Sequence, residues 1–344
     1  MSELQQKLHT DELRDAHGRK VTYLRVSVTD RCNLSCRYCR TSDMPFIPHE
    51  NILRFEEMEQ IIDLMVGMGV RKLRFTGGEP FARKGFIGFL RRIRQKHPGI
   101  GLRITSNATL LGPDIDALKE LDAMMNISLD TLDRERFAAI TGKDLLPDVL
   151  TNLRRMAELG IRLKVNAVAM RGVNDTELPA LAALAMEHAV DVRFIEFMPM
   201  GADSIWSDSL FWPADEILAA AREHWELVPC DEDNRNLEER GPAKLWKLKD
   251  REGRLSAGRF GLISSVSHTF CTTCNRLRLT ADGQIRTCLY DDREWPVRDI
   301  LRSEGIDAVR RVIEDAVAHK PLGSELLKKS SGPVAQKRMS AIGG

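Results

Sequence analysis

The sequence lacks any apolar run long enough to cross a lipid bilayer, and its start is too polar for a secretory signal. It also lacks an excess of charge of one sign, because 51 Lys and Arg residues nearly balance 50 Asp and Glu residues. A chain without a global electrostatic field has no general attraction for nucleic acid or for an anionic membrane. We therefore expect a cytoplasmic protein with neither kind of partner, in which any anion-binding site is local.

Internal repeats and low-complexity tracts are absent as well. With 344 residues, 43% of them hydrophobic, the chain is long enough for a full α/β domain and a smaller second domain. It has seven cysteines, of which six fall into two tight groups. In a large cytosolic chain, clustered thiols are more often metal ligands or redox groups than disulfide partners.

Six short β-branched or apolar runs recur between residues 21 and 200, with helix-period apolar spacing between them. They cover residues 23–28, 72–76, 102–105, 125–129, 163–168 and 192–198. Such alternation predicts βαβ units and a parallel sheet. Six units favour a partial (β/α)6 barrel similar to a TIM barrel, although a doubly wound sheet would give the same local signals.

Polar or glycine-rich residues follow each predicted strand directly, for example Gly77-Gly78-Glu79-Pro80 after the second. Parallel α/β folds place their active sites at the carboxyl ends of the strands. We therefore expect the chemistry to gather on one rim.

The character of the sequence changes near Asp231, where a charged, turn-rich stretch begins. We expect an N-terminal extension over residues 1–20, a barrel domain over 21–240, a C-terminal domain over 241–329 and a tail over 330–344. The C-terminal domain shows strand-like runs at 244–248 and 276–280 and a helical segment near 297–317.

The first cysteine group is Cys32, Cys36 and Cys39, with no fourth cysteine nearby. Three thiolates on a cubane iron–sulfur cluster leave one iron without a protein ligand, and an open metal position marks a site for substrate or cofactor chemistry. A zinc site completed by His49 or by water is the alternative.

The second group, Cys271, Cys274 and Cys288, repeats this pattern of three cysteines. Ligand chemistry alone suits a zinc knuckle with His268 about as well as an iron–sulfur cluster. The seventh cysteine, Cys230, is most simply an idle or buried thiol.

Basic residues occur at positions where a strand would turn them to one face. Arg276 and Arg278 alternate directly after Cys274, and paired guanidinium groups suit a polyphosphate. Within the first, second and fifth predicted strands lie Arg25, Arg74 and Lys164. Buried charges there are costly unless they face an anion, so we predict that they point into the barrel.

The spacing of the first cysteine group, the aromatic Tyr38 before its third cysteine, and the Gly-Gly-Glu-Pro motif resemble the radical S-adenosylmethionine superfamily. Together with the second cysteine spacing and the Gly-Gly end of the chain, they resemble the GTP 3',8-cyclase family of molybdenum-cofactor synthesis over nearly the whole sequence. The fold that this implies is a partial (β/α)6 radical S-adenosylmethionine barrel, followed by a smaller C-terminal domain that carries a second iron–sulfur cluster.

The resemblance also implies roles for individual residues. Contacts to S-adenosylmethionine would come from Tyr38, Gly78, Ser128 and Met198. Contacts to GTP would come from Arg25, Arg74, Thr105, Lys164, Arg276 and Arg278. Each cysteine group would hold a 4Fe-4S cluster, with guanine on the open iron of the second. Catalytic roles would fall to Gly343 and Gly344 in the tail.

The implied reaction begins when a 5'-deoxyadenosyl radical removes the 3' hydrogen of GTP. The ribose then closes onto C8 of guanine, giving (8S)-3',8-cyclo-7,8-dihydroguanosine 5'-triphosphate. Implied partners are an electron donor such as flavodoxin or ferredoxin, pyranopterin monophosphate synthase as the next enzyme, and a second copy of the chain in a homodimer. Two alternatives are a radical S-adenosylmethionine peptide-modifying enzyme and a metal-dependent sensor without enzyme activity.

Because six cysteines form two separate sets, anaerobically reconstituted protein should carry about eight iron atoms in two clusters. Replacing Cys32, Cys36 and Cys39 together by Ala should lower this to about four and stop cleavage of S-adenosylmethionine, since the open iron is lost. Iron analysis and chromatography of 5'-deoxyadenosine measure both effects. A triple variant that still makes 5'-deoxyadenosine would show that the radical centre is elsewhere.

Overall fold

The computed structural model describes residues 12–39, 45–201, 204–230, 241–330, 332–337 and 339–343 of the chain. The chain forms two compact units. The first comprises Met1–Cys32, Met44–Leu102 and Cys271–Gly344, and the second comprises Asn33–Asp43 and Arg103–Phe270. Among the described residues, no helix combines the length and the apolar character that crossing a membrane requires.

The first unit contains strands from both ends of the chain. Its strand order is β12-β11-β10-β1-β2, in which β10, β1 and β2 are parallel and β11 and β12 are antiparallel. The strands are β1 (Tyr23–Ser27), β2 (Lys72–Thr76), β10 (Arg276–Leu279), β11 (Gln284–Arg286) and β12 (Trp295–Pro296). The helices are α1 (Phe55–Gly67), α2 (Phe86–Lys96), α8 (Arg298–Glu304), α9 (Ile306–Ala318), α10 (Gly323–Lys329) and α11 (Met339–Ile342).

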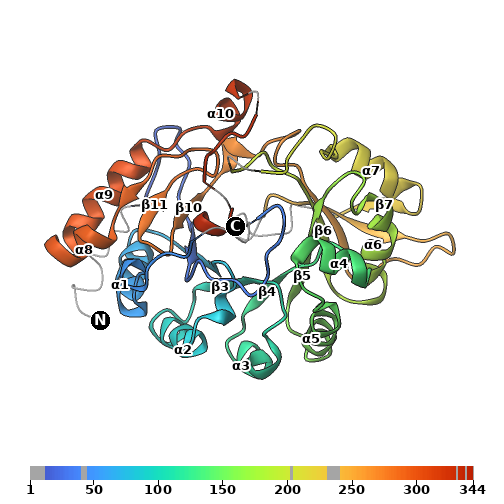
Figure 1. Cartoon of the computed structure of the whole chain (residues 1–344), viewed down its shortest axis with the longest axis horizontal. Coiled ribbons are helices and arrows are strands. Elements are labelled where there is room, and N and C mark those ends of the chain that lie inside the picture. Colours follow the sequence, from blue (N-terminus) through green and yellow to red (C-terminus); the bar gives the residue numbers. More distant parts are fainter. Residues whose placement is uncertain are drawn as a thin grey trace, which may run out of the picture. The chain divides into compact units, whose positions relative to one another are not determined.

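Alternation along the strands explains the core of this unit. Leu24 and Val26 of β1 are fully buried, as are Leu73 and Phe75 of β2. Successive side chains of a strand point to opposite faces, so these apolar residues share the face that the helices cover. In Figure 1, α1, α8 and α9 lie on one side of these strands and the red C-terminal helix α11 on the other. The residues between the apolar ones, arginines among them, therefore face away from the helices.

The strands of the second unit start with β3 (Gly101–Ser106), most of which belongs to it, and have the order β3-β4-β5-β6-β9-β8-β7. Strands β3 to β6 and β9 are parallel, whereas β8 and β7 are antiparallel. The other strands are β4 (Met124–Ser128), β5 (Leu163–Ala169), β6 (Asp191–Glu196), β7 (Glu226–Pro229), β8 (Lys244–Lys249) and β9 (Arg259–Ile263). The helices are α3 (Ile115–Glu120), α4 (Arg134–Thr141), α5 (Leu146–Glu158), α6 (Leu178–Glu187) and α7 (Ala214–Arg222). In Figure 1, α3 and α5 lie along the outer side of this unit's strands.

All six strands predicted between residues 21 and 200 are confirmed, as β1 to β6. The runs at 244–248 and 276–280 are also confirmed, as β8 and β10. The predicted helical segment near 297–317 consists of two helices, α8 and α9, which separate at Gly305, where φ is +85°. Sequence reasoning missed β7, β9, β11 and β12. The predicted domain boundary at residue 240 adjoins residues 231–240, which lie outside the described chain, and it stays a prediction.

Candidate active site

Three arginines form a row across neighbouring strands of the first unit. In the parallel register, Arg25 of β1 lies opposite Arg278 of β10 on one side and opposite Arg74 of β2 on the other. Residues at the same register level of adjacent strands point to the same face. We call Arg278, Arg25 and Arg74 the arginine row.

Tyr23 lies two residues before Arg25, and its register neighbours are Arg276 of β10 and Lys72 of β2. The guanidinium carbons of Arg74 and Arg276 each lie 5.8 Å from the centre of the Tyr23 ring, and Nζ of Lys72 lies 5.4 Å from it. The Tyr23 hydroxyl accepts a hydrogen bond from Nε of Arg74. Burial by itself would raise the pKa of Tyr23, but the surrounding arginines lower it to about 7. Tyr23 thus contacts Lys72, Arg74 and Arg276 at the same time.

Burial disfavours the charged forms of the arginines in the arginine row. It lowers the pKa of Arg25 well below its usual range, and the nearby charges of Arg278 and Arg74 add to the effect. It also lowers the pKa of Arg278 to about 10, with further contributions from Arg276 and Arg286. Like charges held together in a poorly solvated place are unfavourable, and a bound polyanion relieves that cost. The first unit is therefore suited to binding a polyphosphate.

The end of the chain reaches the arginine row. Arg278 donates from Nη1 to the carbonyl oxygens of Gly343, at 2.6 Å, and Ile342, at 3.3 Å. Gly343 has a φ of +71°, and a Cβ built on it would lie 3.1 Å from side-chain carbons of Ser27 and Thr76, at the ends of β1 and β2. Any larger residue would crowd both strands. Ile342 is buried, whereas Gly344 lies outside the described residues.

The second cysteine group is brought together within the first unit. A Cβ built on Gly323 would lie 2.8 Å from Sγ of Cys288 and 3.4 Å from Sγ of Cys271. The amide of Cys274 donates to the carbonyl of Cys271 at 3.3 Å. Burial raises the pKa of Cys288, whereas for Cys274 the charges of Lys320 and Arg276 outweigh burial and lower the pKa. The charges of Cys271 and Cys274 both act on Cys288, and Gly323 leaves space over two of the three sulfurs. This grouping fits an iron–sulfur cluster.

Among the described residues, no three or more His, Cys, Asp or Glu side chains come close enough to hold a single metal ion. His268, the suggested fourth ligand of a zinc knuckle, instead lies 3.2 Å from Asp215. A cluster spaces its ligating sulfurs more widely than one ion does, because several metal and sulfide atoms lie between them.

Of the first cysteine group, Cys32 belongs to the first unit, while Cys36 and Cys39 belong to the second. The amide of Cys39 donates to the carbonyl of Cys36 at 2.9 Å. Amides of the same loop bond the end of α4, since Ser35 donates to Thr141 at 2.9 Å and Arg37 to Ile140 at 3.0 Å. These bonds fix the backbone that carries Cys36.

Tyr38 is anchored beside these cysteines by Asp130, which follows β4. The Tyr38 hydroxyl donates to Oδ2 of Asp130 at 2.6 Å, and the amide of Val168 donates to Oδ1 at 2.8 Å. The Tyr38 ring also meets Phe197 edge to face at 6.3 Å between centroids. Burial raises the pKa of Asp130 to about 6, although both hydrogen bonds oppose it.

Gly78 lies where two backbone segments of the first unit touch. A Cβ built on it would lie 2.3 Å from the carbonyl oxygen of Arg31. The amides of Gly78 and Glu79 donate to the carbonyls of Thr29 and Arg31 at 2.7 and 2.8 Å. These hydrogen bonds join the glycine motif to the segment that leads directly to Cys32. A residue with a side chain at position 78 would not allow the two segments to come this close.

The remaining predicted residues lie in the second unit. Thr105 and Lys164 occupy one register level, on either side of Asn126. Nζ of Lys164 lies 3.8 Å from Oδ2 of Asp191, whose two oxygens also accept hydrogen bonds from Arg259 at 2.6 Å each. Asp191 is therefore shared between Lys164 and Arg259.

Ser128 lies two residues beyond Asn126, opposite Asn166 of β5, which is itself opposite Arg193 of β6. Asn126 and Asn166 each have a buried Oδ1 without a hydrogen-bond partner in the described structure. Buried polar atoms are normally satisfied, so both amides suit a ligand. Met198 follows β6 and is half-buried.

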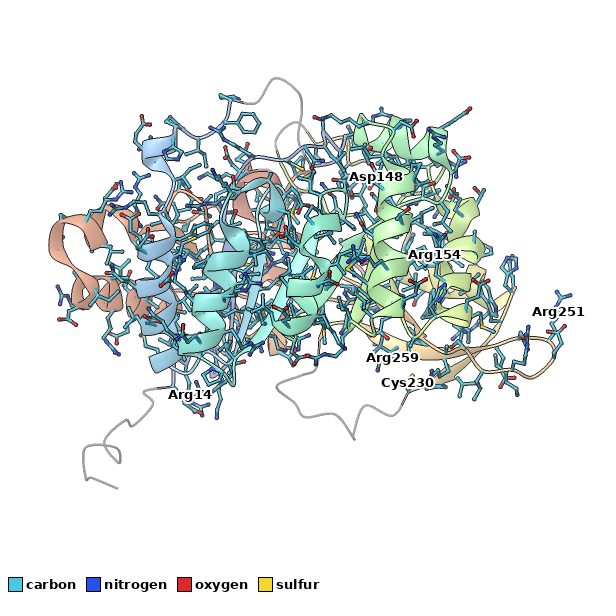
Figure 2. All side chains as sticks on the ribbon, turned by 90° about the horizontal axis from the view of Figure 1, so that it is seen from below. Arg14, Asp148, Arg154, Cys230, Arg251 and Arg259 are labelled. Atoms are coloured by element: carbon cyan, nitrogen blue, oxygen red, sulfur yellow. The ribbon has the colours of Figure 1, made fainter. Side chains whose placement is uncertain are left out.

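Sequence reasoning did not single out Tyr23, Lys72, Asn126 or Arg193 as site residues. The available signal was polarity at alternating positions of otherwise apolar strands. Cys230, in contrast, belongs to neither cysteine group and is half-buried. It follows β7, and Figure 2 shows it beside Arg259 at the end of the strands.

Comparison with known proteins covers most of the chain. The Radical SAM superfamily matches residues 26–185, and the family Molybdenum Cofactor Synthesis C matches residues 190–326. The GTP 3',8-cyclase of Pelotomaculum thermopropionicum is 40% identical over 96% of this chain and all of its own length. The GTP 3',8-cyclases of Petrotoga mobilis and Listeria monocytogenes are 36% and 37% identical, each over 96% of this chain and 99% of their own.

A solved structure is similar in fold. The crystal structure of Streptococcus suis SuiB has a TM-score of 0.61 and 14% identity, over 94% of this chain and 78% of that chain. The radical S-adenosylmethionine fold that the sequence predicted is confirmed.

Asp130 provides a test of the site through pH. Its pKa is higher in the folded protein, about 6, than the ordinary 3.8, so its contribution to stability is full below pH 4 and is lost as pH rises through 6. The stability of D130N relative to the wild type should therefore increase by about 2 kcal/mol between pH 4 and pH 7. Urea unfolding of both proteins across this range measures the difference, and parallel profiles would contradict the assignment.

Proposed function

The chain belongs to the GTP 3',8-cyclase family, and we propose that it converts GTP into (8S)-3',8-cyclo-7,8-dihydroguanosine 5'-triphosphate in molybdenum-cofactor synthesis. The observation that carries this proposal is the arginine row with Tyr23, Arg276 and Lys72 around it. A triphosphate offers several negative charges that match such a cluster of buried and half-buried cations.

The chain is a radical S-adenosylmethionine enzyme, with S-adenosylmethionine and an iron–sulfur cluster as cofactors. Its first cluster is a 4Fe-4S cluster on Cys32, Cys36 and Cys39. When bound, these cofactors supply the 5'-deoxyadenosyl radical that takes the 3' hydrogen of the substrate. The residues that contact S-adenosylmethionine are Tyr38, Gly78, Ser128 and Met198. Support comes from the bond between Asp130 and Tyr38, and from the close backbone contact that only Gly78 permits.

GTP is held by Arg25, Arg74, Thr105, Lys164, Arg276 and Arg278. The arginines bind the triphosphate and thereby fix the position of the ribose. Holding the reacting atoms in near-attack geometry is the main contribution that a protein makes to such a reaction, since it removes the entropy cost of aligning them. The paired Arg276 and Arg278 on one strand face support this division of labour.

Cys271, Cys274 and Cys288 would hold a second 4Fe-4S cluster, whose open iron would offer a binding position for the guanine base. Support comes from the charges of Cys271 and Cys274, which both act on Cys288, and from the space that Gly323 leaves over the sulfurs of Cys271 and Cys288. The tail positions the substrate for cyclisation through Gly343 and Gly344. Support for this role comes from the hydrogen bonds between Arg278 and the carbonyls of Ile342 and Gly343.

The wider setting completes the proposal. The enzyme works in the cytoplasm as a homodimer, with residues 21–240 as the barrel domain and 241–329 as the second-cluster domain. Flavodoxin or ferredoxin supplies electrons, and pyranopterin monophosphate synthase takes the product. No observation favours peptide modification, because SuiB shares only its fold with this chain.

Arg276→Ala and Arg278→Ala should each weaken GTP binding by roughly 1.5 to 3 kcal/mol, or tenfold and more, through one lost charge-assisted contact. Arg71→Ala is the matched control, because Arg71 is exposed just before β2. Isothermal titration with GTP measures all three variants, and iron analysis confirms that both clusters remain. Unchanged GTP affinity in both site variants would show that Arg276 and Arg278 do not contribute to GTP binding.

Full-length protein with GTP, S-adenosylmethionine and a reductant should yield the cyclised product in an anaerobic assay followed by mass analysis. Deleting Gly343 and Gly344, or fusing residues after Gly344, should abolish this product, because the tail no longer positions the substrate. Cluster content, GTP affinity and uncoupled cleavage of S-adenosylmethionine should stay largely intact. A truncated protein that makes product at the full-length rate would rule out the proposed role of the tail.

A further inference from the structure

Lys320, between α9 and α10, is a lysine buried against the second cysteine group. Its side chain is 2% exposed. Its Nζ lies 3.6 Å from Sγ of Cys274 and 3.0 Å from the carbonyl oxygen of Arg276, and it donates to the carbonyl of Thr287 as well. Within the described part of the chain, no carboxylate forms an ion pair with it. A buried ammonium is expensive without a negative partner, and the cysteine sulfur is the one partner here that becomes negative.

The position of Lys320 is fixed from the backbone side by Arg19. Nη2 of Arg19 donates to the carbonyls of Lys320 and Pro321 at 3.2 and 2.9 Å, and Nη1 donates to the carbonyl of Cys271 at 2.7 Å. Nε of Arg19 pairs with Asp15 at 2.5 Å, and both side chains are buried. One guanidinium therefore ties the segment of Lys320 to the loop of the second cysteine group.

The same segment covers the other two sulfurs three residues later. A Cβ built on Gly323 would lie 2.8 Å from Sγ of Cys288 and 3.4 Å from Sγ of Cys271. Residues 320–323 thus present an ammonium to Cys274 and a bare backbone to Cys271 and Cys288. Residues that surround the ligands of a metal centre commonly act in these two ways: some leave space for the centre, and others supply charge and hydrogen bonds to its ligands.

We propose that Lys320 donates a hydrogen bond to the sulfur of Cys274 and raises the reduction potential of the second iron–sulfur cluster. The inference rests on the proposed presence of that cluster. One-electron reduction adds a negative charge to a cluster, and a fixed cation beside a ligating sulfur stabilises the reduced form. Lys320 is therefore a positioning residue, which acts on the substrate only through the cluster.

The test uses the full chain with Cys32, Cys36 and Cys39 all replaced by Ala, so that only the second cluster contributes a signal. In this background, Lys320→Met removes the charge and the hydrogen bond at similar side-chain length, and Lys320→Gln removes the charge alone. Lys329→Met is the matched control, because Lys329 is exposed at the end of α10. Each protein is reconstituted anaerobically, analysed for iron and titrated with dithionite while the reduced cluster is followed by electron paramagnetic resonance.

We expect about four irons in every protein, with a more negative reduction potential in both Lys320 variants and an unchanged potential in Lys329→Met. Full iron content with unchanged reduction potentials in the Lys320 variants would overturn the inference about Lys320 but not the proposed second cluster. Loss of iron from both Lys320 variants would also overturn it, since Lys320 would then be required for assembly. Absence of iron in the parent triple variant would overturn the second cluster itself, and this inference with it.

Discussion

Burial of like charges on β1, β2 and β10 is the constraint on which the rest of the active site depends. The backbone register brings Arg278, Arg25 and Arg74 to one level of neighbouring strands, so that their side chains leave the sheet on the same face. The apolar residues that alternate with them, such as Leu24 and Phe75, hold the strands against the helices. The free energy of this apolar core keeps the cations together when no anion is present. Tyr23 relieves the repulsion in part, because its ring and hydroxyl both face the cations.

This arrangement explains why parts of the fold and of the site could be predicted. A strand with apolar residues on one face and charges on the other shows its period of two in the sequence, as Tyr23–Ser27 does. The missed strand β9 contains Gly261, where a Cβ would lie 2.7 Å from the side chain of Arg193. The glycine that allows this close contact also removes the β-branched signal by which strands are recognised. Strands β11 and β12 are too short, at three and two residues, to show any period.

Other parts of the site depend on contacts between residues far apart in the chain, and no local pattern predicts them. Arg19 reaches the carbonyl of Cys271 across 252 positions and that of Lys320 across 301. In the sequence, Lys320 follows a helix, where a basic residue commonly favours the carbonyl end of the helix dipole. Its burial beside Cys274 comes entirely from tertiary packing. Sequence reasoning therefore suggests candidate sulfur ligands, whereas the groups that set their electrostatic environment are found only from the structure.

The two ends of β10 connect the proposed phosphate and cluster chemistry within one unit. Arg276 begins the strand two residues after Cys274, and its carbonyl accepts a hydrogen bond from Lys320. Arg278 lies two residues further along the strand and donates a hydrogen bond to the carbonyl of Gly343. A strand is stiff over such a short distance, so the cysteine, the two arginines and the tail keep fixed positions relative to one another. A shift of β10 along β1 by one residue would move both arginines to the apolar face. The register between β1 and β10 therefore fixes where the two arginines lie relative to the second cysteine group.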